Sequence, residues 1–231
     1  LAQRLGAAAR DLPRSMRELT LSSLDGEFRS PLVLSALPAD AAREVEPRLA
    51  TAGHLVVSNA SAFRADPQVP LLVPDVNPEH LDLLDAQAER WGNSGGGIVT
   101  NPNCSVAGLV VALRPLHQRF GVRSVVVTTL QAISGAGRPG PSAADLLDNV
   151  IPFIGNEEDK VEREPRKILG TLSGERLIEA DITVGATCTR VPVLHGHTAS
   201  VSVRFEHEAR AHEVAETLYH FFWGEVADWY L

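Results

Sequence analysis

The sequence contains few cysteines and no long apolar run. Its 231 residues include only Cys104 and Cys188, which do not make a disulfide framework and favour a reducing compartment. No apolar stretch approaches the roughly 20 residues that cross a bilayer, and the N-terminus lacks the basic-then-apolar layout of a signal peptide. These absences predict a cytoplasmic protein with no membrane partner.

Positive charge is also scarce. The formal net charge is -8, which argues against a broad nucleic-acid-binding surface and mainly promotes solubility. Hydrophobic residues make up 44% of the chain and charged residues 22%, as in an ordinary soluble globular protein. The length is sufficient for one large or two small domains.

A glycine-rich turn that could bind cofactor phosphates is missing near the N-terminus. Gly6 and Gly26 are isolated there, in a stretch that has helical apolar spacing from Leu1 to Leu12 and then becomes polar and charged. Asn93 to Gly97 contains three glycines, but it leads into a short strand, Ile98 to Thr100, and does not open a helix. That context favours a flexible loop over a phosphate cradle.

The most informative stretch is the turn that contains Cys104. The residue before a proline is pushed away from the α region, so Asn101-Pro102 predicts a turn. The apolar residues from Val106 to Leu113 then follow the spacing of an amphipathic helix that ends at Gly121. Cys104 is therefore expected at a helix N-terminus, where unpaired N–H groups favour the nucleophilic thiolate. The alternative is an inert buried cysteine, and position alone leaves the two interpretations about equal.

Earlier in the chain, a strand, a helix and a second strand follow one another. Leu32 to Leu37 predicts a buried parallel strand, and Asp40 is a good N-cap for a helix over Ala41 to Ala50. The next short strand is His54 to Ser58. This order is typical of a doubly wound α/β sheet, in which ligands bind at the carboxyl ends of the strands.

The second half of the chain is predicted to combine strands and helices. Asn156 to Glu164 indicates a solvated helix, and Glu206 to Leu231 an amphipathic helix with an aromatic tail. Alternation along one strand makes Cys188 a structural cysteine. The expected strands cover Ser124 to Ile133, Thr183 to Cys188, and Val201 to Phe205.

Histidines near the C-terminus do not complete a metal site. His212 and Glu216, and Glu216 and His220, have the i, i+4 spacing of two ligands on one helix face. Together with His207 they still lack a full ligand set, so no metal is expected.

An ordered set of short motifs carries a family resemblance. Asn101-Pro102-Asn103-Cys104, followed by an apolar helix, is similar to the active-site segment of aspartate-β-semialdehyde dehydrogenases. Each further motif is weak, but the set from about Pro31 to Phe205 is specific. The segments that resemble the archaeal and fungal branch of this family are, in order, Ser35 to Pro38, Val57 to Ala60, Pro70 to Pro74, Val76 to Leu81, Ser134 to Gly137, Asp148 to Ile154, Arg166 to Gly170, Ala186 to Arg190, and Gly196 to Thr198.

The resemblance implies two domains. Residues 1–103 would form a partial Rossmann-like doubly wound nucleotide domain. Residues 104–231 would form an α+β catalytic and dimerisation domain of the glyceraldehyde-3-phosphate dehydrogenase C-terminal type. Relative to the family, the sequence looks truncated or diverged at both ends. A homodimer or a dimer of dimers is implied, with apolar strands such as Val201 to Phe205 as a partner surface.

The resemblance also assigns catalytic roles. Cys104 would be the nucleophile, His197 the acid–base group, and Gln131 the contact to the acyl group. Arg190, seven residues before His197, would hold the substrate carboxylate, since its planar fork matches a carboxylate. Histidine titrates near neutral pH, which suits proton transfer. His195 is the rival, and a loop position is the simpler interpretation for it.

Binding residues follow in the same way. Glu157 would bind the substrate ammonium, although the neighbouring Glu158 is an alternative. Lys160 and Arg64 would hold phosphate, whereas a lone loop arginine is more often only solvated. Asn103 would position the acyl oxygen or the nucleophile turn. The cofactor would contact two segments, listed as Ser35, Ala36, Leu37 and Pro38 in the first and Ser134 and Gly135 in the second.

The implied reaction is the NADP-dependent interconversion of L-aspartate-4-semialdehyde and 4-aspartyl phosphate through a cysteine thioester. Two alternatives stay open. One is a related acyl-phosphate reductase with another substrate. The other is a catalytically silent relative or fragment that serves as a structural subunit, which the missing glycine-rich turn supports. Retention of Cys104, Gln131, Arg190 and His197 argues against the silent relative.

Overall fold

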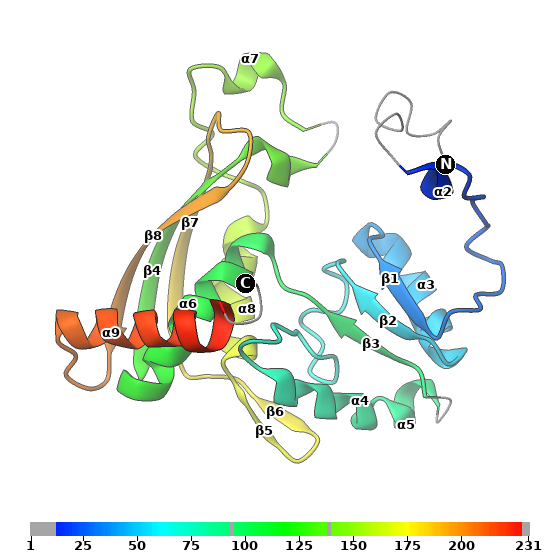
Figure 1. The fold of residues 1–231 in the computed structure, drawn as a ribbon, viewed down its shortest axis with the longest axis horizontal. Coiled ribbons are helices and arrows are strands. Elements are labelled where there is room, and N and C mark those ends of the chain that lie inside the picture. Colours follow the sequence, from blue (N-terminus) through cyan, green and yellow to red (C-terminus); the bar gives the residue numbers. More distant parts are fainter. Residues whose placement is uncertain (1–12, 93–94, 138–139, 228–231) are drawn as a thin grey trace. The chain divides into compact units, whose positions relative to one another are not determined.

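The computed structural model describes residues 13–92, 95–137 and 140–227, which belong to two units (Figure 1). In the first unit, Leu1–Pro31, the described residues contain one helical turn, α2 (Arg14–Arg17), and no strand. The helix predicted between Leu1 and Leu12 lies outside the described residues. The second unit, Leu32–Leu231, contains the Cys104 turn and every strand found in the described part of the chain.

Three parallel strands in the order β1-β2-β3 form the first sheet. They are β1 (Leu32–Ser35), β2 (Leu55–Ser58) and β3 (Gly97–Thr100), and α3 (Ala39–Thr51) connects the first two. The predicted strand–helix–strand order is therefore confirmed. Three short helices precede β3: η2 (Pro78–Asp82), α4 (Leu83–Ala86) and α5 (Ala88–Trp91). Of the predicted glycine loop, residues 93 and 94 lie outside the described residues, and Gly97 belongs to β3.

Two details of the prediction for this sheet are wrong. α3 begins at Ala39, so Asp40 lies inside its first turn, where the carboxylate binds Arg43 and does not cap the helix. β1 is not a buried strand, because it forms the edge of the three-stranded sheet and leaves Leu34 78% exposed. A strand needs neighbours on both sides and cover on both faces before its apolar run is fully buried.

The second sheet is built around β4 (Val122–Gln131). β4 pairs in parallel with β7 (Thr183–Arg190) and antiparallel with β8 (His197–Phe205), which gives the order β7-β4-β8. The three predicted strands are confirmed, although β4 begins and ends two residues earlier than its predicted range, and β7 and β8 are longer than predicted.

Helices and short elements complete the second half. α6 (Cys104–Phe120) and α8 (Glu157–Ile168) contact the second sheet, and α9 (Ala211–Phe221) contacts α6. The amphipathic helix predicted after Glu206 is therefore shorter than predicted, and residues 228–231 lie outside the described residues. The remaining elements are η3 (Ile133–Ala136), α7 (Ala143–Leu146), β5 (Thr171–Ser173), β6 (Arg176–Ile178) and η4 (Phe222–Val226).

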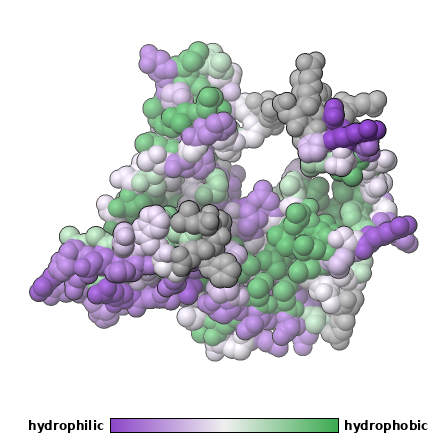
Figure 2. All heavy atoms as spheres, viewed as in Figure 1, coloured by the Kyte–Doolittle hydropathy of each residue, from purple (hydrophilic) through white to green (hydrophobic). Residues whose placement is uncertain are grey.

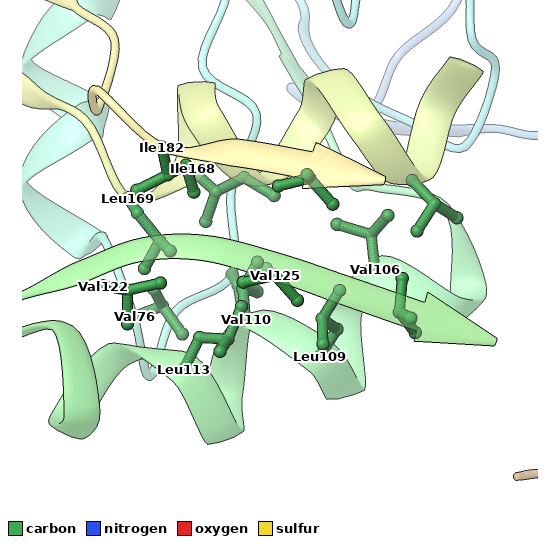
Figure 3. Packing of buried hydrophobic residues seen from close by; sticks show 14 of the residues in the cluster. Val76, Val106, Leu109, Val110, Leu113, Val122, Val125, Ile168, Leu169 and Ile182 are labelled. Atoms are coloured by element: carbon green, nitrogen blue, oxygen red, sulfur yellow. The ribbon is translucent and has the colours of Figure 1, made fainter. Parts of the chain in front are cut away.

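The core lies between α6, α8 and one face of the second sheet. Val106, Leu109 and Leu113 of α6 point toward the sheet, as their spacing predicts, and pack with Val125 of β4 and Ile168 of α8 (Figure 3). The other face of β4 is exposed, because its even-numbered residues point away from the helices.

The two sheets occupy separate parts of the sequence. The first lies within residues 32–100 and the second within residues 122–205. The domain boundary between residues 103 and 104 falls between them and stays a prediction. In the described part of the chain, none of the helices combines the length and apolar character needed to cross a bilayer.

His80 of η2 is fully buried and is held as a neutral imidazole. Oδ1 of Asn77 accepts a hydrogen bond from the N–H of Val73, so its Nδ2 donates to Nδ1 of His80 at 2.9 Å. Nε2 then carries the proton and lies 3.2 Å from the carbonyl oxygen of Gly170. Burial lowers the pKa of His80, although the bond to Gly170 opposes this.

We expect the stability that depends on neutral His80 to be lost as the pH falls through 6.5. Because burial places the folded-state pKa below that value, the unfolded state binds more protons in this window, and the free energy of unfolding decreases. Relative to His80→Gln, which cannot titrate, the wild type should lose up to about 1 kcal/mol between about pH 7 and pH 5.5. Urea unfolding at both pH values measures the difference, and the same change in both proteins would contradict it.

The core packing predicts a large cost for shortening Leu113, which is 2% exposed. Leu113→Ala should lower the free energy of unfolding by about 2–5 kcal/mol, because it removes buried methyl groups and leaves a cavity. The matched control is Leu34→Ala, whose exposed side chain should change stability by no more than about 0.5 kcal/mol. Chemical denaturation gives both values. An equal loss of free energy of unfolding in the two variants would contradict the burial of Leu113 in the core.

Candidate active site

Cys104 is the first residue of α6, at the helix N-terminus, as predicted. Asn103 is the N-cap, and its side-chain oxygen accepts a hydrogen bond from the N–H of Ser105 at 2.9 Å. Cys104 is exposed, so the interpretation as an inert buried cysteine is wrong for it. That interpretation applies to Cys188, which is buried, and burial raises the pKa of the Cys188 thiol.

His197 lies against the sulfur of Cys104, with Nε2 3.3 Å from Sγ. The N–H of Ala132 donates to Nδ1 of His197 at 3.1 Å, so the proton of the neutral ring is on Nε2. This N–H therefore points at the sulfur of Cys104. His195 lies in the exposed connection between β7 and β8, away from this contact.

The second sheet brings three of the predicted residues into one row. Gln131, the last residue of β4, lies opposite Arg190 of β7 on one side and His197 of β8 on the other. Residues opposite one another in neighbouring strands point to the same face. Gln131 and Arg190 are buried, and Nη1 of Arg190 donates to the carbonyl of Ala132 at 2.7 Å. The arginine fork is thus anchored at one end.

Gly135 lies close to the side chains of both His197 and Arg190. A Cβ atom there would come within 2.9 Å of Cε1 of His197 and 3.2 Å of Nη1 of Arg190. The backbone of η3 therefore approaches both side chains more closely than any other residue allows. Ser134 is fixed next to it, because its N–H donates to the carbonyl of Leu194 at 3.1 Å.

Glu157, the first residue of α8, connects the nucleophile turn with the sheet. Its carboxylate accepts hydrogen bonds from the side chains of Asn103 at 2.7 Å, Gln131 at 3.4 Å and Lys160 at 2.8 Å. Burial alone would raise the pKa of Glu157, but these bonds and the charge of Lys160 lower it, so the carboxylate is ionised. Glu158 faces the other way and accepts from the N–H of Cys188.

Arg64 is largely buried, in contrast to the solvated arginine that a lone loop position usually indicates. Its Nη1 binds the carboxylate of Glu164 at 3.0 Å, and its Nη2 donates to the carbonyl of Asn59 at 2.9 Å. The buried Nε has no hydrogen-bond partner among the described residues. Burial raises the pKa of Glu164, although the N–H of Asn103 and the charge of Arg64 oppose this.

The sequence interpretation missed Glu164 and Lys167. Lys167 is 4% exposed and its ammonium donates to three main-chain carbonyls in the segment that begins at Arg64. Burial lowers its pKa to about 8. A signal existed: Glu157, Lys160, Glu164 and Lys167 are spaced three, four and three residues apart, which places them on one helix face.

The predicted cofactor segment Ser35 to Pro38 begins at the carboxyl end of β1 and leads into α3. The hydroxyl of Ser35 donates to the buried carboxylate of Glu46 at 2.6 Å, as does the hydroxyl of Ser58 at the end of β2. Glu46, also missed from the sequence, thus joins α3 to both strand ends. Leu37 lines the cleft, so this part of the segment can contact a cofactor directly.

Part of this set lines one cleft of about 910 Å³: Arg64, Asn103, Cys104, Gly135, Glu157 and Lys160 do, whereas Gln131, Arg190 and His197 are not among its lining residues. Small side chains and glycine on its walls leave room for a flat ring, and Arg64 and Lys160 supply positive charge. Among the described residues, no three His, Cys, Asp or Glu side chains form a group that could hold a metal. Lining residues include Leu37, Asn59, Ala60, Cys104, Gly135 and Glu157.

Two domain families match the chain. The semialdehyde dehydrogenase NAD binding domain matches residues 3–84, and the semialdehyde dehydrogenase dimerisation domain matches residues 113–229. The first match includes the N-terminal stretch in which no glycine-rich turn is visible.

Named relatives come from archaea and fungi. The chain is 48% identical over 206 residues to an aspartate-semialdehyde dehydrogenase of Archaeoglobus fulgidus, which covers 89% of the chain and 60% of the relative. It is 50% identical over 180 residues to one of Cryptococcus neoformans, which covers 75% of the chain and 49% of that relative. The chain therefore spans between about half and three fifths of the length of these relatives.

Solved structures show the same fold. Aspartate semialdehyde dehydrogenase with NADP from Candida albicans matches with a TM-score of 0.81 and 38% identity, over 90% of this chain and 62% of that one. Aspartate semialdehyde dehydrogenase II complexed with ASA from Vibrio cholerae matches with a TM-score of 0.68 and 30% identity, over 82% of this chain and 60% of that one. These matches confirm the predicted fold class, a Rossmann-like nucleotide domain with an α+β catalytic and dimerisation domain. The chain belongs to the semialdehyde dehydrogenase family.

Proposed function

We propose that this chain catalyses the NADP-dependent, phosphorylating oxidation of L-aspartate-4-semialdehyde to 4-aspartyl phosphate, with biosynthetic flux in the reverse direction. The observation that carries the proposal is the 3.3 Å contact between Sγ of Cys104 and Nε2 of His197 at the N-terminus of α6. Groups suited to a carboxylate, an ammonium and a phosphate lie around this pair. Relatives named aspartate-semialdehyde dehydrogenase support the same reaction.

The first step is attack of the Cys104 thiolate on the aldehyde carbon, which forms a thiohemiacetal. The N–H at Nε2 of His197 donates a hydrogen bond to the oxygen as its negative charge develops. The N–H of Ala132 supports this role, because its bond to Nδ1 keeps the proton of the neutral ring on Nε2. Gln131, in the same row of the sheet, orients the acyl group.

The charged ends of the substrate have partners of opposite charge. Arg190 is anchored to the Ala132 carbonyl through Nη1 and can bind the substrate carboxylate with its other donors. Glu157 is ionised and already binds one ammonium, that of Lys160, so an amino group of the substrate suits it as well. Asn103 holds Glu157 toward the nucleophile turn through its side-chain amide.

Phosphate then cleaves the thioester. A phosphate oxygen attacks the carbonyl carbon, the C–S bond breaks, and the Cys104 thiolate leaves. Arg64 and Lys160 are the proposed phosphate ligands. The buried Nε of Arg64 supports this role, since a bound anion would satisfy its hydrogen-bonding capacity.

The residues present fit a nicotinamide cofactor. The NAD binding domain match and the Candida albicans relative solved with NADP support NADP. A bound nicotinamide would supply the hydride acceptor that oxidation of the thiohemiacetal to the thioester needs. Gly135 lines the cleft next to His197 and adds no side chain there, and the N–H of the neighbouring Ser134 donates to the carbonyl of Leu194. Ser35 to Pro38 are the proposed contacts on the nucleotide side.

A homodimer, or a dimer of dimers, is part of the proposal. The dimerisation domain match covers the second sheet. On its exposed face, Val126 and Leu130 are 63% and 41% exposed and lie opposite the uncharged Ser202 and Thr198 of β8. Figure 2 also shows hydrophobic surface over the loop that carries α7, where Leu147 is 72% exposed. Uncharged surface of this kind is typical of a subunit interface. A cytoplasmic location remains our expectation for such an enzyme.

The first test of the proposal is turnover by the chain itself. With aspartate semialdehyde, NADP and phosphate, absorbance of NADPH should increase in a phosphate-dependent way. Cys104→Ala should abolish this increase, because the nucleophile is lost. The matched control is Cys188→Ala, which removes a buried thiol outside the cleft and should retain turnover. No turnover, together with no NADP binding, would instead favour a silent relative or a fragment.

The geometry also predicts which thiol reacts. Near neutral pH, iodoacetamide should alkylate Cys104 at least about tenfold faster than Cys188, because Cys104 is exposed and hydrogen-bonded to His197 whereas burial raises the pKa of Cys188. His197→Ala should slow the reaction at Cys104 several-fold. Mass spectrometry of time points measures both rates, and equally slow labelling of the two thiols would count against an activated nucleophile.

A further inference from the structure

One face of α8 holds two segments that are distant in the sequence. Glu157 binds the side chain of Asn103, immediately before Cys104. Two and three turns further along the same face, Glu164 and Lys167 reach the segment that begins at Arg64. The proposed phosphate ligand and the nucleophile are thus both attached to this one helix.

Glu164 makes the most direct connection between them. Its Oε1 accepts from Nη1 of Arg64 at 3.0 Å, and its Oε2 accepts from the main-chain N–H of Asn103 at 2.6 Å. The carboxylate is 7% exposed, so little water competes with these two bonds. Each oxygen therefore holds a different part of the site, and hydrogen bonds to an ionised acceptor are among the strongest in proteins.

Lys167 restrains the main chain of the same segment. Its ammonium donates to the carbonyls of Arg64 at 2.8 Å, Asp66 at 2.6 Å and Val69 at 2.7 Å. These bonds fix the backbone that carries Arg64, but they do not by themselves fix its long side chain. The position of the guanidinium is consequently set by Glu164 and by the carbonyl of Asn59.

We infer that Glu164 is a positioning residue, which fixes the Arg64 guanidinium relative to the Asn103–Cys104 turn so that bound phosphate meets the acyl group on Cys104. The inference rests on the proposed function, since it takes Arg64 as a phosphate ligand. Arg64 and Cys104 line the same cleft. A displacement of about 1 Å between reacting groups can cost roughly 100-fold in rate, so a rigid link between them is valuable.

Only a carboxylate of this length can make both bonds. Glutamine offers one acceptor oxygen, and its amide N–H groups would face either the guanidinium or the N–H of Asn103, both of which are donors. Aspartate is one methylene shorter and can reach only one of the two partners. Glu164→Gln and Glu164→Asp therefore break the link in different ways.

The experiment compares wild type, Glu164→Gln and a matched control, Glu162→Gln. Glu162 lies on the same helix and its carboxylate accepts from the N–H of Ala186, outside the cleft. Alkylation of Cys104 by iodoacetamide is followed over a range of inorganic phosphate concentrations, and the concentration that protects half of the thiol is recorded. The Michaelis constants for phosphate and for the semialdehyde are measured on the same samples.

Glu164→Gln should raise the half-protecting phosphate concentration and the KM for phosphate by about tenfold or more, which is the range expected for losing a hydrogen bond to a charged group. The KM for the semialdehyde should change by less than about twofold, because the groups that hold its ends remain. Glu162→Gln should match the wild type. A Glu164→Gln protein with the wild-type melting temperature and wild-type phosphate values would overturn the inference.

The outcomes separate the two proposals. Wild-type turnover with unchanged phosphate values in Glu164→Gln leaves the proposed function standing and removes the inference. Phosphate protection without turnover in the wild type removes the proposed function, and the protection values of the variants then decide the inference. No protection and no turnover in the wild type overturns both. If circular dichroism shows that Glu164→Gln is unfolded, Glu164→Asp replaces it, because it retains the charge. Glu164→Asp should also raise the half-protecting phosphate concentration and the KM for phosphate. Wild-type values in that variant would reject the link.

Discussion

The pairing of β4 with one parallel and one antiparallel strand is the constraint on which the site depends. Because β7 and β8 run in opposite directions, the end of β7 and the beginning of β8 meet at the end of β4. A short connection then places Arg190 and His197 on either side of Gln131. The same face of β4 carries Val125 and Val127, which are buried against the helices. A slip of one residue would expose these valines and turn Gln131 away, so core packing and site geometry are fixed by one register.

Local patterns explain how much of this could be predicted. The helical spacing after Asn103 located α6, and with it Cys104, because an amphipathic helix and its cap are encoded by residues within a few positions of one another. The order of strand and helix in the first sheet was predictable for the same reason. The edge position of β1 was not, since the exposure of Leu34 depends on which strands pair, and its own sequence does not contain that information.

Residues whose partners are distant in the sequence were missed. Glu164 and Lys167 belong to a charged helix that could as well have been solvated, and their partners lie some 60 to 100 residues earlier in the chain. Glu46 is similar: nothing near it in the sequence indicates that two serines at the ends of different strands donate to its carboxylate. Long-range hydrogen bonds of buried charged groups leave no periodic pattern, so they become visible only when the fold is known.

The alternating charges along α8 explain how two carboxylates can lie buried close to the Cys104 turn. Without a partner of opposite charge, Glu157 and Glu164 would be costly to bury. Each is bound to a cation, Lys160 or Arg64, which balances the charge locally. These ion pairs use only some of the donors on each cation: an ammonium has three and a guanidinium five. Glu157 and Glu164 of α8 can therefore hold Lys160 and Arg64 in fixed, partly buried positions. Both cations still have donors for an anionic ligand in the cleft.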